Sequence, residues 1–140
     1  MKVAYNNCFG GFSLSHLATV EYAKRKGITL TAYEQTKYRH EGGVEEYVRV
    51  IHPSRICTHY LTEDLGDVIS ELPNDLSYYE SFYGEDTRCD KDLINIIEVW
   101  GKEANGICAD LVIEEIPDGV DFEITEYDGN ESVVPPRMSW

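Results

Sequence analysis

The stretch DKDLINIIEVWGKEANG, residues 90–106, decides the fold class, because it is the clearest helix pattern in a chain that otherwise consists mostly of strand patterns. Asp90 or Asp92 supplies an N-terminal cap, and Gly106 supplies the stop at the other end. Four apolar residues recur at helical spacing and form one stripe: Leu93, Ile97, Trp100 and Ala104. The sequence therefore predicts one long helix late in the chain.

A second helix is predicted near the start of the chain, over about 14–26, after a strand over 2–8 and a double-glycine turn. Ser13 or Ser15 can cap it, and Gly27 stops it. Its apolar face consists of Leu14, Leu17, Ala18 and Tyr22. Such a turn brings N–H groups and hydroxyls to a helix N-terminus, where an anion can bind. A tight turn before an ordinary serine cap is the plainer interpretation, and both stay open.

The rest of the chain has strand patterns rich in β-branched residues. Predicted strands run over 28–35, 47–53, 56–62 and 108–117, and others adjoin turns at Asp118-Gly119 and Asp128-Gly129. The short joint at Pro53-Ser54-Arg55 indicates a hairpin or a bend in one edge, and residues 65–75 indicate a helical turn ended by Pro73. Because long α/β alternation is missing, we expect an α+β fold: mostly antiparallel sheet and two main helices in a single domain, 1–140.

Charge is unevenly distributed along the 140 residues. Residues 1–60 carry eight Lys/Arg against five Asp/Glu, a net +3, while residues 61–140 carry four against twenty-one, a net −17. Long nucleic acids and anionic membranes are poor partners for this balance, because they need a broad basic surface. No run of 18 apolar residues and no leader-like start is present, so we expect a soluble, non-secreted protein.

Metal and nucleophile motifs are not found in the sequence. The four cysteines and four histidines have no metal-ligand spacing, which predicts reduced thiols and no metal or other cofactor. Neither a nucleophile motif nor a Walker loop is present, so no catalytic residue is assigned. Acidic residues could serve acid–base hydrolysis, but the neighbours Glu114 and Glu115 point to opposite faces of a strand. A solvated sheet face is the plainer interpretation.

Two groups of residues have the chemistry to bind a nucleotide. Four aromatics fall within six residues, and they form either a strand edge packed on the core or a stacking platform for a ring: Tyr78, Tyr79, Phe82 and Tyr83. Arg55, Arg88 and Arg137 lie in or beside predicted loops, and each offers a planar fork that matches phosphate. Surface ion pairing is the plainer interpretation for any single arginine.

Longer motifs resemble those of one protein family. They are MKVAYNNCFGGFSLS at the start, R-x-D-x-x-L-I over 88–94, GKEANG over 101–106, IEEIPDGVDFEI-x-EYDG-x-E over 113–131 and R-x-x-W over 137–140. Together they resemble the phage anti-Thoeris sponge family, the first type described, over nearly the whole chain. One departure is Ile107, where relatives are expected to carry Arg after A-N-G.

The resemblance implies a non-catalytic binding protein. Members of that family bind, without degrading, the glyco-cyclic ADP-ribose signal of bacterial TIR-domain defence enzymes, and some also sequester cyclic trinucleotides made by CBASS enzymes. They assemble as homo-oligomers with ligand pockets between subunits, and a hexamer is favoured here. The implied location is the cytoplasm of the infected bacterial host. The alternatives are a phosphodiesterase or glycohydrolase acting on such signals, and a phage interaction protein without a small ligand.

The resemblance and the residue chemistry together give two sets of candidate ligand contacts. The set for cyclic ADP-ribose comprises Arg55, Phe82, Tyr83, Arg88, Asp90, Asp92, Asn105 and Arg137. The set for cyclic trinucleotides comprises Ser13, Ser15, His16 and Arg25. In the second set, symmetry-related copies of the capped helix start would surround the phosphates with N–H and hydroxyl donors.

Overall fold

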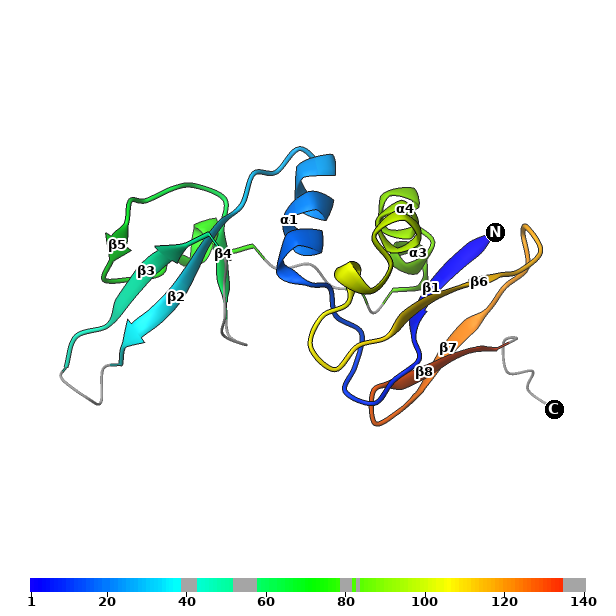
Figure 1. Ribbon diagram of the computed structural model, residues 1–140. Helices are drawn as coiled ribbons and strands as arrows, with labels where there is room; N and C mark the ends of the chain where they lie inside the picture. The colour runs from blue at the N-terminus through cyan, green and yellow to red at the C-terminus, as the bar shows by residue number, and fades with distance from the viewer. Residues whose placement is uncertain (39–42, 52–57, 79–81, 83, 135–140) are drawn as a thin grey trace. The chain divides into compact units, whose positions relative to one another are not determined.

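A computed structural model of the chain describes residues 1–38, 43–51, 58–78, 82 and 84–134 (Figure 1). Every strand pair within these residues is antiparallel, and helices accompany the sheets, so the predicted α+β class is confirmed. The chain divides into two compact units: unit 1 comprises 1–22 with 81–140, and unit 2 comprises 23–80. The sequence predicted one domain and gave no indication of this internal division.

Unit 1 contains two antiparallel strand pairs. Strand β1 (Lys2–Asn6) pairs with β6 (Leu111–Glu115), and β7 (Glu123–Tyr127) pairs with β8 (Asn130–Val134). Asp128 and Gly129 join β7 to β8 with φ values of 51° and 85°. Two consecutive positive φ angles are what a two-residue hairpin turn requires, because they match the twist of the flanking strands. The predicted turn at these two residues is therefore confirmed.

The long helix of unit 1 is α4 (Lys91–Trp100). Its N-cap is Asp90, whose carboxylate accepts the N–H groups of Asp92 at 2.8 Å and Leu93 at 3.3 Å. The helix ends earlier than predicted, because Gly101 has a φ of 57° and a 3₁₀ turn, η2 (Gly101–Ala104), follows. The prediction that Gly106 supplies the stop was wrong.

Two other helices contribute to unit 1, the short α3 (Glu85–Arg88) and the first residues of α1 (His16–Arg25). Ser15 is the cap of α1, since its Oγ accepts the Ala18 N–H at 3.2 Å. Leu14 lies before the helix, and Leu17 is 58% exposed, so the predicted apolar face is narrower than expected. Only Ala18 and Tyr22 of that face are buried.

The core of unit 1 forms where α4 packs against β1 and β6. Its buried members are Ala4, Ala18, Tyr22, Leu93, Ile94, Ile96, Ile97, Ala104 and Leu111. Trp100, predicted on the apolar stripe, is half-buried at the margin of this cluster. None of the described helices has the length and apolar character needed to cross a bilayer.

Unit 2 is built on a four-stranded sheet in the order β4-β2-β3-β5. Its strands are β2 (Thr31–Lys37), β3 (Glu46–Val50), β4 (His59–Leu61) and β5 (Val68–Ile69). Because β2 lies between β3 and β4, these two strands do not form the hairpin that the sequence suggested, and the joint between them lies outside the described residues. A small core of Tyr33, Tyr47 and Leu61 packs on this sheet.

The 65–75 region differs from its prediction. It contains the edge strand β5, and its helical turn, η1 (Asn74–Leu76), begins after Pro73 instead of ending at it. Proline is tolerated at the start of a helical turn, because its missing N–H would have no partner there in any case.

Candidate binding site

Three aromatic side chains from distant parts of the sequence meet in unit 1. The ring of Phe82 lies 5.3 Å from that of Phe12 and 5.6 Å from that of Tyr22, measured between centroids. Phe12 comes from the loop after β1 and Tyr22 from α1, while Phe82 precedes α3. We call these three residues the aromatic cluster. Tyr22 is only 4% exposed and belongs to the core, whereas Phe12 and Phe82 are half-buried and keep part of their surface exposed.

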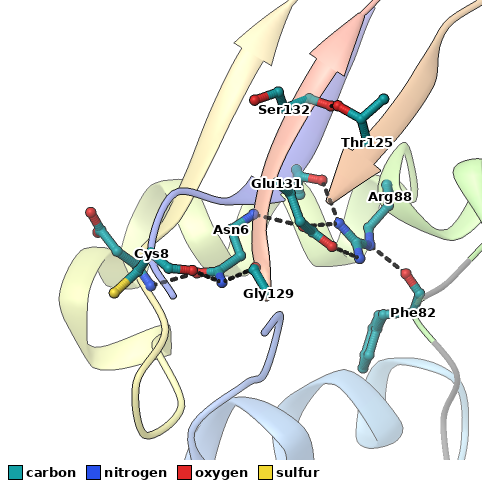
Figure 2. A network of polar contacts seen from close by, with 10 residues as sticks. Asn6, Cys8, Phe82, Arg88, Thr125, Gly129, Glu131 and Ser132 are labelled. Carbon is teal, nitrogen blue, oxygen red and sulfur yellow. Dashed lines mark hydrogen bonds and ion pairs between the residues drawn. The ribbon is translucent and has the colours of Figure 1, made fainter. Parts of the chain in front are cut away.

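Arg88 contacts the aromatic cluster from the interior of unit 1. Its guanidinium carbon is 3.9 Å from the centroid of the Phe12 ring, a cation–π arrangement. Its Nε–H donates to the carbonyl of Phe82 (Figure 2). The side chain is only 2% exposed. One buried guanidinium therefore contacts two of the three aromatic residues.

The buried charge of Arg88 is balanced by Glu131 on β8, which is 5% exposed. The two side chains form a bidentate pair, with N–H···O distances of 2.7 and 2.8 Å (Figure 2). Paired forks of this kind are among the strongest hydrogen-bonded ion pairs in proteins. Removing one partner alone would leave a desolvated charge, so the loss of a single member is expected to destabilise unit 1.

The same pair occupies two backbone groups on the free edge of β1. The Asn7 N–H donates to Asp110 on the β6 side, so the Asn6 N–H, one residue away, points to the opposite edge. There it donates to Glu131 at 2.8 Å, while Arg88 donates to the Ala4 carbonyl at 3.3 Å. Two side chains thus take the place of a neighbouring strand.

Asn6 connects three loops through its fully buried amide. Its Nδ2 donates to the carbonyls of Cys8 at 2.7 Å and Gly129 at 2.8 Å, and its Oδ1 accepts the Asp110 N–H at 2.8 Å (Figure 2). With the backbone bond to Glu131, this residue ties β1 to the loop after it, to the β7–β8 turn and to the entry of β6. The loop carrying Phe12 is therefore fixed at its base.

The double-glycine turn packs closely against the β7–β8 turn. A Cβ on Gly129 would lie 2.2 Å from the Gly11 nitrogen, and the Gly10 N–H already donates to the Asp128 carbonyl at 3.1 Å. Gly10 and Gly11 have φ values of 117° and 99°, a region that favours glycine. The plainer interpretation of this motif, a tight structural turn, accounts for these contacts.

Three of the cyclic ADP-ribose candidates have structural contacts close to one another. Arg88 and Phe82 are joined as above, and Asp90 accepts a long hydrogen bond of 3.5 Å from the Tyr22 hydroxyl besides capping α4. Asn105 lies apart from these contacts: its Oδ1 accepts the Leu111 N–H at 2.9 Å. Asp92 is half-buried in the first turn of α4. The other three candidates, Arg55, Tyr83 and Arg137, lie outside the described residues.

The cyclic trinucleotide candidates lie along α1. Ser15 caps the helix and also donates its hydroxyl to the Glu103 carbonyl at 2.7 Å. The hydroxyl of Ser13 lies against Gly106, where a Cβ would approach it to 2.1 Å. His16 is half-buried at the first position of the helix, and Arg25 lies in the last turn, about 13.5 Å further along at 1.5 Å per residue. Arg25 of the same chain therefore cannot join the serines at one phosphate.

Other features of the described residues bear on chemistry. Burial, with Asp86 nearby, raises the pKa of the Cys89 thiol, which keeps it protonated at neutral pH. No group of three or more His, Cys, Asp or Glu within the described ranges is placed to hold a metal ion. An open hollow of unit 2 is lined by Val68, Ile69, Ser70, Glu71 and Pro73, none of which was predicted to bind a ligand.

The sequence did not identify four residues that build the site: Asn6, Phe12, Tyr22 and Glu131. Phe12 stood inside the quoted turn motif and Tyr22 was assigned to a helix face, but nothing local links either to Phe82. Glu131 was part of a motif, while its partner Arg88 lies 43 residues away.

Comparisons with family descriptions, with curated proteins and with solved structures find no match for this chain.

Proposed function

We propose that this protein is a phage anti-defence sponge that binds cyclic nucleotide immune signals without cleaving them. Its ligands would be glyco-cyclic ADP-ribose and, at a second site, cyclic trinucleotides, in the cytoplasm of an infected bacterium. The family resemblance of its motifs supplies this ligand class. The observation that carries the proposal is the aromatic cluster, because half-buried Phe12 and Phe82 offer a ring surface on which a nucleobase can stack.

Preorganisation supports binding without turnover. The loop of Phe12 is fixed by Asn6, and the backbone of Phe82 is fixed by Arg88. A site that is already ordered loses little conformational entropy when the ligand binds, and this raises affinity. Asp90, which accepts a long hydrogen bond from the Tyr22 hydroxyl, is the polar group that we assign to a ribose or base contact.

The second ligand class and the assembly belong to the same proposal. The hydroxyls of Ser13 and Ser15 and the side chain of His16 would face the phosphates of a cyclic trinucleotide, with Arg25 supplied by another copy of the chain. This arrangement requires a homo-oligomer, and a hexamer is favoured. Because Ser15 also caps α1, Ser13→Ala is the cleaner variant to test this site.

Native mass spectrometry tests the proposed function directly. Purified protein is titrated with glyco-cyclic ADP-ribose isomers and with cyclic trinucleotides, and the bound ligand is then released by heat and identified. Intact ligand at a fixed ratio per oligomer supports the sponge. Cleaved ligand would show a phosphodiesterase or glycohydrolase, and no binding of either class would leave a protein without a small nucleotide ligand.

A matched pair of phenylalanine variants tests the site. Phe82→Leu should weaken binding of glyco-cyclic ADP-ribose by about 5- to 150-fold in calorimetry, since stacking of one base on an aromatic ring contributes roughly 1–3 kcal/mol. Phe9→Leu is the control, because Phe9 is 55% exposed and contacts Tyr127 instead of the aromatic cluster. Equal affinities for both variants would place the ligand elsewhere.

A further inference from the structure

The sequence offered Arg88 as a phosphate ligand, but its N–H groups have partners inside unit 1. Two donate to Glu131, one to the Ala4 carbonyl and one to the Phe82 carbonyl (Figure 2). The flat face of the group lies over Phe12. At 2% exposure the guanidinium has little access to a ligand. The guanidinium instead contacts two members of the aromatic cluster, the Phe82 carbonyl and the Phe12 ring.

Glu131 fixes the direction of this guanidinium. Its two carboxylate oxygens accept both terminal nitrogens of Arg88, and Oε1 also accepts the Asn6 N–H of β1. The planar fork is therefore held in one plane by β8 and β1 together. In that plane Nε–H reaches the backbone of Phe82, and the face of the group covers Phe12.

From this geometry we propose that Arg88 and Glu131 form a positioning pair that sets the arrangement of Phe12 and Phe82, and with it the affinity of the aromatic cluster for a nucleobase. The part concerning affinity rests on the proposed function, whereas the part concerning the rings does not. Neither residue touches the ligand. Arg88 acts through the Phe82 carbonyl and the Phe12 ring, and Glu131 acts through Arg88.

Stability alone does not explain why an ion pair is found here. Replacing a buried pair by apolar side chains of similar volume is often neutral or stabilising, because the pair loses its hydration on burial. An apolar side chain, however, has no N–H for the Phe82 carbonyl and no positive charge for the Phe12 ring. Lysine also lacks the planar fork, so only arginine serves both contacts at once.

The test uses Arg88→Lys in the full chain. This variant keeps a positive charge for Glu131 and leaves the Glu131 bond to Asn6 in place, but it removes the planar group that contacts the Phe82 carbonyl and the Phe12 ring. The matched control is Arg49→Lys, the same change at an arginine of unit 2 that contacts Asp64 and Asp67 at the surface. Circular dichroism first shows that both variants keep their secondary structure.

The first readout needs no ligand. The chain has four phenylalanines, so selective ¹³C labelling gives a small set of ring signals. We expect Arg88→Lys to shift and broaden the Phe12 and Phe82 signals, while Phe9 and Phe122 stay unchanged, and Arg49→Lys to move none of the four. Unchanged Phe12 and Phe82 signals in folded Arg88→Lys would overturn the proposal.

The second readout is affinity for glyco-cyclic ADP-ribose. Arg88→Lys should bind roughly tenfold more weakly at unchanged stoichiometry, because the rings must be reordered on binding. Affinity within twofold of wild type, despite moved ring signals, would contradict the link between the pair and binding. If the wild-type protein itself binds no nucleotide, the proposed function fails, while the ring signals still decide whether Arg88 positions the cluster.

A second variant covers the case in which Arg88→Lys does not fold. The double change Arg88→Met/Glu131→Leu replaces the pair by apolar groups and leaves no buried charge. A folded double variant with displaced Phe12 and Phe82 signals supports the positioning role. The same variant with wild-type ring signals would show that packing alone places the rings.

Discussion

In unit 1, Arg88 contacts Glu131 where both side chains are almost fully buried, whereas in unit 2, Arg49 contacts Asp64 and Asp67 at the exposed surface. Unit 1 carries five Lys/Arg against sixteen Asp/Glu, a net charge of −11, while unit 2 carries seven against ten, a net −3. The more acidic unit has thus placed one of its few cations in its interior. The buried contact of unit 1 holds its neighbours in a specific arrangement. The exposed contact of unit 2 is weakened by water and salt, so it contributes little.

The cores differ in the same direction. Among the described residues, the hydrophobic core cluster of unit 1 has nine buried members around α4, β1 and β6, while the cluster on the sheet of unit 2 has three. A larger close-packed core transmits the loss of one side chain to more neighbours. We therefore expect changes inside unit 1 to have larger effects than matched changes in unit 2. The first two experiments below test this expectation, and the other two examine a turn of unit 1 and a surface ion pair of unit 2.

The largest effect is expected from Glu131→Gln. It leaves the shape of the side chain but removes the charge that balances buried Arg88, which should cost about 3–5 kcal/mol of unfolding free energy. Hydrogen exchange of β1 and β6 amides measures this loss, with β2 and β3 amides of unit 2 as the internal reference. Equal loss of protection in both units would show that they unfold as one, and the comparison between them would no longer hold.

Leucine truncation compares the two cores at equal burial. Leu93 in unit 1 and Leu61 in unit 2 are both fully buried. Leu→Ala at a buried site costs about 2–5 kcal/mol, depending on how far the surroundings relax. We expect Leu93→Ala near the upper end and Leu61→Ala near the lower end in urea unfolding. The reverse order would contradict our view of the larger core.

Two glycines of unit 1 separate crowding from backbone strain. Gly119→Ala meets no atom within 4 Å, so only its positive φ is unfavourable, at roughly 1 kcal/mol. Gly129→Ala has the same type of φ but also places its Cβ 2.2 Å from Gly11, so the turn must move. Thermal unfolding should show a clearly larger drop for Gly129→Ala. Similar decreases in unfolding temperature for both variants would mean that the double-glycine turn moves away from the new Cβ at little cost.

The smallest effect is expected at the surface of unit 2. A hydrogen bond from Arg49, and another from the Gly66 N–H, lower the pKa of Asp64. A lowered pKa in the folded state contributes stability above the pKa of the unfolded chain, and this contribution is lost as pH falls through the folded value. Carboxyl NMR should place the Asp64 midpoint below 3.8, and Arg49→Gln should raise it. A midpoint that Arg49→Gln leaves unchanged would mean that this contact does not persist in solution.

The sequence predicted elements whose causes are local. The Asp90 cap, the serine cap of α1 and the Asp128-Gly129 turn depend on residues within a few positions of one another. The order β4-β2-β3-β5 was missed, because strand order depends on pairings between distant segments. Arg88 was predicted as a phosphate ligand for a related reason: its fork fits a carboxylate equally well, and the sequence does not show which anion it meets.

The contacts of Arg88 and Glu131 with the edge of β1 have a consequence for how the protein behaves at high concentration. An open strand edge offers unpaired N–H and carbonyl groups to any other chain, and this is a common start of aggregation. On β1 the Asn6 N–H and the Ala4 carbonyl are already occupied by Glu131 and Arg88. Variants that break this pair should therefore form intermolecular β-structure before they lose their helices, so their first visible defect would be in solubility.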